Sequence, residues 1–258
     1  MIDPASVDQR RVTVPLDVIG DVHACLPELE TLLDVLGYAP DRQGVWRSAA
    51  GRLAVFVGDF VDRGPSNAGV LRLAMRMLEA RTALAVPGNH DVQLERHLAG
   101  EPVPLVYGLA ETVAELSREP AAFQDDVLSF LQSLPGHLVL DEGRLVVAHT
   151  GLAEAFHGST AASIRRLAAY GVIDGEMDPG DPEKRHAWVR DYTGAASVVY
   201  GHTSVAEPAW RGRTLDIDTG CVFGWRLTAL RWPERTLVSV PAHHAYARSG
   251  RRFFEGQG

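Results

Sequence analysis

The sequence predicts an α/β protein in which two mixed β-sheets pack together and helices flank them. Short apolar runs rich in valine and leucine recur along the chain, and each ends at a glycine and a polar residue. Such runs are typical of buried strands that lead into loops. Amphipathic helical patterns separate the first three runs, whereas later runs follow one another without helices. This order indicates mixed sheets rather than a purely parallel one.

Residues 12–90 predict strand, helix, strand, helix, strand, which gives two right-handed crossovers between parallel strands. The first helix, "PELETLLDVLGY", has leucines at helical spacing, Pro27 near its start and Gly37 as its stop. The second, "PSNAGVLRLAMRMLEA", repeats the pattern, and residues 108–134 predict more helix. Later strands, expected to be antiparallel neighbours, lie at 138–148, 197–201, 213–218, 226–231 and 235–240. We expect one domain, residues 1–258, in which 91–135 and 152–195 are candidate cap segments.

Composition narrows the class of protein. Of 258 residues, 46% are hydrophobic and 22% charged, which is ordinary for a globular chain. No run of about 18 apolar residues occurs, and the first residues have no apolar signal region, so we expect a cytoplasmic protein that does not contact a membrane. The net charge of -8 argues against an extended nucleic-acid surface. Cys25 and Cys221 are interpreted as free, buried thiols.

Six predicted strands end in the same way, and we call these places strand-end motifs. They read "GDVHAC", "GDFVDRG", "GNHD", "VVAHTG", "YGHT" and "DIDTG". Functional side chains of open α/β sheets gather at the carboxyl ends of the strands. Together the motifs bring carboxylates, imidazoles and one amide, with glycine beside them for sharp turns or close backbone approach.

The candidate metal ligands form an oxygen and nitrogen set without sulfur, which suits Mn, Fe, Zn or similar divalent ions. Six ligands are too many for one ion and suit two ions that share a bridging carboxylate, expected to be Asp59. Two such ions can hold a hydroxide between them and clamp an in-line phosphoryl displacement. The predicted ligands are Asp21, His23, Asp59, Asn89, His149 and His202.

Neighbouring residues supply candidate catalytic groups. Arg63 can fork onto phosphate oxygens. His90 can protonate the leaving group, provided that a carboxylate, for which Asp62 is the candidate, keeps it cationic. Asp218 is expected to orient Arg63 rather than to bind metal. The six other histidines lack this context and are interpreted as structural or surface residues.

The motifs from Gly20 to Thr203 resemble those of calcineurin-like metallophosphoesterases of the phosphoprotein phosphatase type. Within that group the chain is similar to the phosphatase module of bacterial polynucleotide kinase-phosphatase, which acts in RNA repair. Stretches such as "YGLAETVAEL", "LVVAHTGL" and "IDTGCVFGWRLTALRWPERTLVSVPA" carry this likeness almost to the C-terminus. The resemblance implies a four-layer sandwich fold.

The resemblance also implies roles for the motif residues. One metal would be held by Asp21, His23 and Asp59 and the other by Asp59, Asn89, His149 and His202. The two metals are usually Mn, with Fe, Zn, Ni or Co as alternatives. Ala24 replaces the glycine usual in this motif and would be strained at a positive φ. "GNHD" replaces the "GNHE" common among protein phosphatases, which argues against a protein substrate. The chain has no "GxxxxGK[ST]" phosphate loop, so only a phosphatase step is expected.

Several functions remain open. The leading hypothesis is a phosphoesterase that hydrolyses phosphate monoesters, and also 2′,3′-cyclic phosphodiesters, of nucleotides or nucleic-acid ends. The alternatives are a serine/threonine protein phosphatase, a symmetrical diadenosine tetraphosphate hydrolase and, more remotely, a metal-binding adaptor without catalysis. The substrate, the metal and the oligomeric state are not determined by the sequence.

Segment 152–195 contains both cations and aromatic rings. These could bind phosphates and bases, or they could form a solvated helix face with core aromatics. They are Arg165, Arg166, Tyr170, Lys184, Arg185, Trp188 and Tyr192.

Overall fold

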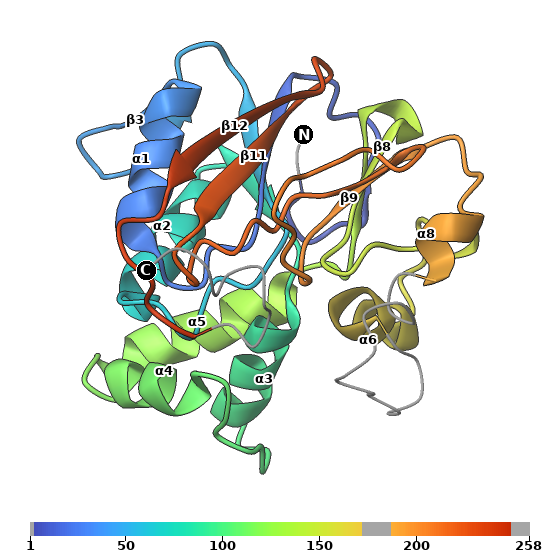
Figure 1. Cartoon of the computed structure of the whole chain (residues 1–258). Helices are drawn as coiled ribbons and strands as arrows, with labels where there is room; N and C mark the ends of the chain where they lie inside the picture. The colour runs from blue at the N-terminus through green and yellow to red at the C-terminus, as the bar shows by residue number, and fades with distance from the viewer. Residues whose placement is uncertain (1–2, 172–186, 249–258) are drawn as a thin grey trace.

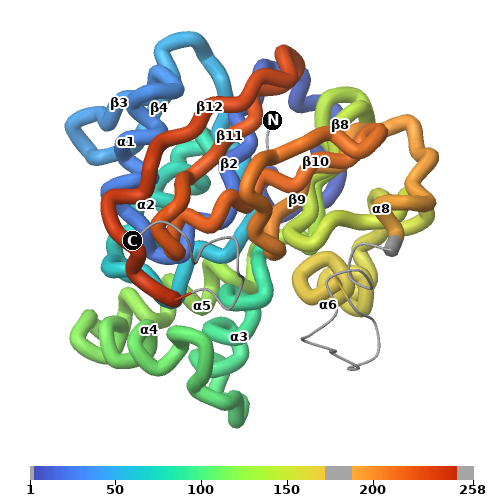
Figure 2. The backbone as a smooth tube through the Cα atoms, viewed as in Figure 1, coloured from blue at the N-terminus to red at the C-terminus, as the bar shows by residue number. Residues whose placement is uncertain are grey.

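The computed structural model describes residues 3–171 and 187–248. Two five-stranded sheets lie face to face, with helices outside them (Figures 1 and 2). The predicted class, two packed mixed sheets flanked by helices, is confirmed. No helix in the described ranges is long and apolar enough to cross a membrane.

The first sheet contains the predicted crossovers. Its strand order is β12 (Thr236–Pro241), β11 (Arg226–Trp232), β2 (Leu16–Ile19), β5 (Leu53–Phe56) and β6 (Ala83–Ala85). Strands β2, β5 and β6 are parallel, as predicted, and β11 is antiparallel to both β2 and β12. The parallel strands therefore all end at one edge of the sheet.

The crossover helices are α1 (Leu26–Leu36) and α2 (Asn67–Glu79). Helix α1 has proline in its first turn and ends at Gly37, whose φ of 88° is in the left-handed region that glycine adopts without strain. Between α1 and β5 the chain forms a hairpin that the sequence analysis missed, β3 (Tyr38–Pro40) with β4 (Trp46–Ser48).

The second sheet differs from its prediction. Its order is β1 (Asp8–Gln9), β7 (Leu138–Leu140), β8 (Leu145–Val147), β9 (Ser197–Tyr200) and β10 (Thr214–Asp216). Residues 138–148 form two antiparallel strands that meet at the turn η1 (Asp141–Gly143), not one strand. Strands β8, β9 and β10 are parallel, so the prediction of antiparallel neighbours was wrong here. Their connections are about a dozen residues or longer, which lets the chain return to the same end.

Apolar layers separate the sheets and their helices. Between the sheets, Val18 and Val55 of the first pack with Leu145, Val147 and Val199 of the second. A second core lies between the first sheet and helices α1 and α2. The short helix α8 (Ala187–Asp191) covers the outer face of the second sheet through Trp188 and Val189. The layers thus follow the order helix, sheet, sheet, helix.

Segment 91–135 and helix α6 (Ala162–Tyr170), which belongs to the other candidate cap segment, lie beyond one end of the sheets (Figure 1). Segment 91–135 continues helix α3 (Asn89–Leu98) and contains α4 (Leu109–Leu116) and α5 (Ala121–Ser133). Val127, Leu131 and Leu134 of this segment are buried. Segment 152–195 contains η2 (Glu154–Phe156) and α6 (Ala162–Tyr170) before α8. A capping role for these segments stays a prediction.

Candidate active site

The six strand-end motifs meet at one edge of the paired sheets. They follow β2, β5 and β6 in the first sheet and β8, β9 and β10 in the second, so parallel strands of both sheets lead into the site. This arrangement brings together residues that are far apart in the sequence. The backbone N–H of His202, for example, donates to Asp21 Oδ2 over 3.0 Å across 181 residues.

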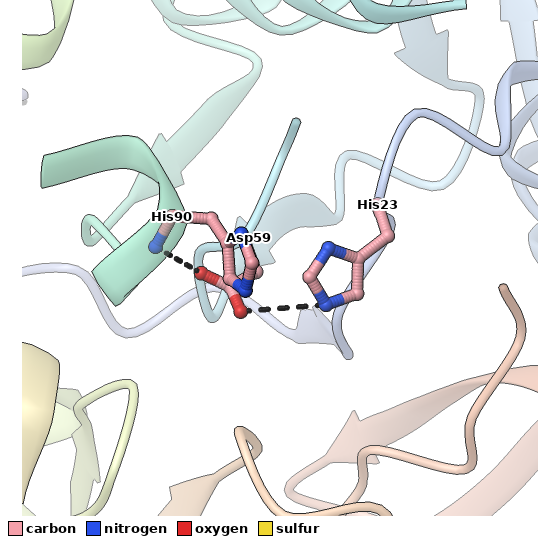
Figure 3. Close-up of side chains that lie close together, drawn as sticks. All are labelled: His23, Asp59 and His90. Atoms are coloured by element: carbon pink, nitrogen blue, oxygen red, sulfur yellow. Dashed lines mark hydrogen bonds and ion pairs between the residues drawn. The ribbon is translucent and has the colours of Figure 1, made fainter. Parts of the chain in front are cut away.

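Asp59 lies at the centre of the site. Its Oδ2 atom is 3.4 Å from His23 Nε2 and 3.4 Å from His149 Nε2, so one carboxylate oxygen faces two imidazoles. Its Oδ1 atom accepts the backbone N–H of His90 over 3.0 Å. Figure 3 shows the Asp59 carboxylate between His23 and the start of α3.

Backbone carbonyls set the orientation of both imidazoles. His23 Nδ1 donates to the carbonyl of Val61 at 2.9 Å, and His149 Nδ1 donates to that of Val57 at 3.0 Å. Since a carbonyl only accepts, the neutral ring carries its hydrogen on Nδ1 and its lone pair on Nε2. Both Nε2 lone pairs then face the Asp59 carboxylate, an arrangement that a cation or a proton between them would stabilise.

A second group of polar atoms surrounds Asn89. Its Oδ1 atom lies 2.8 Å from His202 Nδ1 and 3.2 Å from His149 Nε2. The two imidazoles meet edge to face, with ring centroids 5.1 Å apart. Three ligand atoms thus converge beside Asp59.

Asp21 has a buried oxygen, Oδ1, with no hydrogen-bond partner among the described residues. The chain approaches it closely, since a Cβ on Gly201 would lie only 1.9 Å from this oxygen. Burial, together with the charges of Asp218 and Asp59, raises the pKa of Asp21 well above its ordinary value. A buried carboxylate oxygen that lacks a hydrogen-bond partner and lies near other negative charges is suited to binding a cation.

The donor set therefore fits divalent metal ions. Within the site, two groups of side chains have ligand atoms within 4.8 Å of one another, namely His23, Asp59 and His90, and Asp59, His149 and His202. Asp59 belongs to both, which is the arrangement expected of a bridging ligand. Although burial alone would raise the pKa of Asp59, the imidazoles of His149 and His90 lower it well below its ordinary value. The first group contains His90 where the predicted set has Asp21.

His90 has the partner that the sequence suggested. Its Nδ1 atom donates to Asp62 Oδ2 over 2.5 Å, and both side chains are buried. The His90 ring meets the His23 ring edge to face, with centroids 4.8 Å apart. Because Nδ1 is bonded to Asp62, the second ring nitrogen, Nε2, is the one that can reach a reacting group near Asp59.

Arg63 lies in the site, but Asp218 does not orient it. Arg63 donates from Nη1 to His23 Nε2 over 2.9 Å and lies over the Phe223 ring. Asp218 accepts instead from Ser204 Oγ at 2.8 Å and from the amide of Gly220 at 2.9 Å, so both of its oxygens brace the loops after β9 and β10. Among the described residues no hydrogen bond or ion pair joins Asp218 to Arg63. A cation on His23 Nε2 would compete with Arg63 for the same lone pair.

Asp91 has a structural function that the sequence analysis did not assign. Its carboxylate accepts the backbone N–H groups of Asp59 at 2.7 Å, Phe60 at 2.9 Å and Gly88 at 2.8 Å. It therefore ties the loop after β5 to the loop after β6. Burial, with the charge of Asp59, raises the pKa of Asp91 to about 8. In the sequence, the only sign of this function is the position of Asp91 directly after Asn89 and His90.

The turn after β2 keeps positive φ values although Ala24 replaces the usual glycine. His23 and Ala24 have φ values of 43° and 57°. Their backbone N–H groups donate to the carbonyls of Asp59 and Phe60, each over 2.8 Å. These bonds between the first two motifs hold alanine in a conformation that costs about 1–2 kcal/mol for a residue with a side chain.

The remaining predictions concern residues outside this cluster. Cys25 and Cys221 are free and buried. Arg165 does not reach the site, because it pairs with Glu95 of α3 at 2.7 Å and donates to carbonyls of α5. Trp188 and Tyr192 pack around the second sheet, which matches the core alternative. Lys184 and Arg185 lie outside the described residues.

Comparison with known proteins identifies the family. The family model for calcineurin-like phosphoesterases matches residues 14–230. The chain belongs to this family of metallophosphoesterases, as the strand-end motifs predicted.

Two named proteins are similar to this chain over most of its length. The chain is 41% identical over 231 residues to a Geobacillus thermodenitrificans protein named bis(5′-nucleosyl)-tetraphosphatase PrpE, asymmetrical, and covers 94% of that protein. It is 39% identical to the Bacillus subtilis protein of the same name, over 97% of its length. These alignments span 88% and 90% of this chain. The likeness to the polynucleotide kinase-phosphatase module stays a prediction.

Solved structures agree with the fold. A protein described as a candidate diadenosine tetraphosphatase superposes with a TM-score of 0.66 and 25% identity, over 92% of this chain and 97% of the other. A serine/threonine phosphatase from Saccharomyces cerevisiae superposes with a TM-score of 0.60 over 94% of this chain and 84% of its own, but with 13% identity it supports the fold alone.

Proposed function

We propose that this protein hydrolyses bis(5′-nucleosyl) tetraphosphates asymmetrically, into a nucleoside triphosphate and a nucleoside monophosphate. The observation that carries the proposal is the position of Asp59 Oδ2, 3.4 Å from both His23 Nε2 and His149 Nε2, which provides a shared ligand between two nitrogen donors. The tetraphosphatases that are 41% and 39% identical along nearly their whole length support this substrate class.

Two divalent cations complete the proposed site, and manganese is the favoured metal. The residues that would hold them are the six predicted ligands, namely Asp21, His23, Asp59, Asn89, His149 and His202. When bound, the cations would stabilise the charge on the phosphoryl oxygens and acidify water. Arg63, whose guanidinium already lies in the site, would bind phosphate oxygens through its fork of N–H groups.

In the proposed reaction, the oxygen of water attacks a phosphorus atom and the bond from that phosphorus to the leaving oxygen breaks. His90 Nε2 gives its proton to the departing oxygen when that oxygen is basic. Asp62 holds the His90 ring through the bond to Nδ1. A proton leaves the attacking water, so the nucleoside triphosphate and the nucleoside monophosphate together contain the atoms of the substrate and of one water.

Product analysis tests the proposal. Metal-free protein would be supplied with Mn²⁺ and diadenosine tetraphosphate, and the nucleotides separated by ion exchange. We expect equal amounts of ATP and AMP. Two molecules of ADP would show symmetrical cleavage, and a preparation that hydrolyses simple phosphate esters but leaves the tetraphosphate intact would overturn the proposal.

Monoester hydrolysis is a second candidate, favoured by the buried His90–Asp62 pair. A phosphate leaving group departs from an anhydride without a proton, whereas a ribose alkoxide needs one. An enzyme restricted to anhydrides would therefore gain little from this pair. Rates on a nucleoside 3′-phosphate and on a nucleoside 2′,3′-cyclic phosphate, measured beside the tetraphosphate, decide which substrate is preferred.

A further inference from the structure

A side chain from helix α4 reaches the proposed acid pair. Thr112 is buried, and its Oγ1 atom donates to Asp62 Oδ1 over 2.5 Å. The other oxygen of the same carboxylate, Oδ2, accepts the hydrogen of His90 Nδ1. One carboxylate is thus held from both sides, by a hydroxyl of the candidate cap segment and by the imidazole.

The single hydrogen of the Thr112 hydroxyl has three acceptors within reach. Besides Asp62, they are Asn67 Oδ1 at 2.9 Å and the Gly108 carbonyl at 3.2 Å. The Asp62 oxygen is the nearest and, as a carboxylate oxygen, the strongest acceptor. We therefore assign the hydrogen to the bond with Asp62.

The backbone at Asp62 needs external support. Asp62 and Arg63 have φ values of 75° and 71°, in the left-handed region that side chains disfavour. Asn67 Oδ1 accepts the backbone N–H of Asp62 over 2.8 Å. Residues in such conformations persist only where their surroundings hold them, and they cluster at functional sites.

Helix α4 also holds the Asn67 side chain that supports the Asp62 backbone. Glu115, one turn after Thr112, accepts hydrogen bonds from the backbone N–H and the side-chain amide of Asn67 and from the backbone of Ala68. This fixes the amide of Asn67 with its oxygen towards Asp62. Helix α4 therefore supports the backbone conformation of Asp62 through Glu115 and Asn67, and the orientation of its carboxylate through Thr112.

We propose that Thr112 is a positioning residue for proton donation, because its hydroxyl fixes the Asp62 carboxylate that orients His90. The inference rests on the function proposed for His90, which protonates a leaving group when that group is basic, as in the hydrolysis of a phosphate monoester. Without the hydroxyl, the carboxylate can turn about its side-chain bonds, and His90 Nε2 loses its alignment with the leaving oxygen. Steps that need no proton are then affected little.

The test compares Thr112→Val, which has nearly the same shape but no hydroxyl, with Thr112→Ser, which keeps it. Each Mn²⁺-loaded protein would be assayed on phenyl phosphate, whose leaving group is strongly basic, and on p-nitrophenyl phosphate, whose leaving group is weakly basic. For Thr112→Val we expect kcat to fall about 10- to 100-fold on phenyl phosphate, the range for losing a hydrogen bond to a charged group. On p-nitrophenyl phosphate the fall in kcat should be within about threefold. Thr112→Ser, which keeps the hydroxyl, should hydrolyse both substrates at rates close to those of the unaltered protein.

The controls separate this inference from the proposed function. Thr31→Val removes an exposed helical hydroxyl that donates to the Pro27 carbonyl, and should change neither rate. His90→Ala shows whether an acid acts at all. If His90→Ala is selective between the two substrates but Thr112→Val is not, the Thr112 inference fails and the role of His90 stands. If His90→Ala is not selective, both fail. Should Thr112→Val not fold, Thr112→Ala takes its place against Thr112→Ser.

Discussion

The two ring nitrogens of His90 have different surroundings. Nδ1 is bonded to the buried Asp62 carboxylate, whereas the ring belongs to a group of potential ligands with His23 and Asp59. The same geometry suits a general acid held by a carboxylate and a metal ligand held by one. Substrates with different leaving groups separate the two interpretations.

Replacing His90 by alanine should cost about 10²–10⁴-fold in kcat on phenyl phosphate and far less on p-nitrophenyl phosphate, because only the basic leaving group needs a proton. Arg63→Ala should slow both reactions alike, since the guanidinium acts on the phosphoryl group itself. Steady-state rates and metal content, measured on the same preparations, check this. Equal losses on both substrates with a lower metal content would make His90 a ligand.

At the scale of elements, an ion pair and hydrogen bonds join α6 to the other candidate cap segment. Arg165 of α6 pairs with Glu95 of α3 and donates to the carbonyls of Leu131 and Leu134. The chain can approach this closely because residue 136 is glycine, where a Cβ would lie 2.6 Å from Arg165 Cα. Next to it, His137 Nε2 accepts the amide of Gly158 over 2.8 Å.

His137 should make stability depend on pH. Burial, with the charge of His157, lowers the pKa of His137 from 6.5 to about 4. Between these values the unfolded chain binds a proton that the folded chain does not. The free energy of unfolding should therefore rise with pH through this window, by on the order of 3 kcal/mol, and be fully present above the unfolded pKa.

Urea unfolding of His137→Gln between pH 4.5 and 7 measures this contribution. Glutamine can still accept the Gly158 amide but does not titrate, so we expect a flatter dependence of unfolding free energy on pH than in the unaltered protein. His244→Gln, at an exposed ring, is the matched control and should keep the original slope. An unchanged slope in His137→Gln would assign the dependence to other groups.

For the whole molecule, the convergence of parallel strands concentrates buried negative charge. Burial raises the pKa of both Asp21 and Asp218, and the charge of Asp59 adds to the effect. Folding in the absence of cations must therefore bring these carboxylates together against their repulsion. Cations that bind only the folded chain would relieve it.

Chelation should lower the thermal midpoint and abolish hydrolysis, and Mn²⁺ should restore both. At a concentration 100 times the dissociation constant, a metal adds about 2.7 kcal/mol, or about 5–10 °C for a chain of this size. Asp59→Asn should remove activity and the response to Mn²⁺ without destabilising the metal-free protein. Scanning calorimetry beside an activity assay checks this, with Asp41→Asn at an exposed site as control. Full turnover by metal-free protein would contradict the metal proposal.

The parts of the fold and site that depend on local pattern could be predicted from the sequence. Alternation of apolar runs with amphipathic helices predicted β2, α1, β5, α2 and β6 in parallel order, since burial and periodicity are properties of neighbouring residues. Polar residues directly after those runs located the site, because parallel strands end at one edge. The pairing of Asp62 with His90 was also predicted, and the hydrogen bond is present.

Features that depend on contacts between distant segments became known from the three-dimensional structure. The parallel pairing of β8, β9 and β10 follows from the path of their connections, which no local pattern shows. Asp218 was assigned to Arg63, but Ser204 and Gly220 take its oxygens. Thr112, which lies 50 residues from Asp62, could not be connected to it from the sequence. The orientation of a side chain is set by whichever partners the packed elements bring within hydrogen-bond reach, and these are known only once the sheets and helices are assembled.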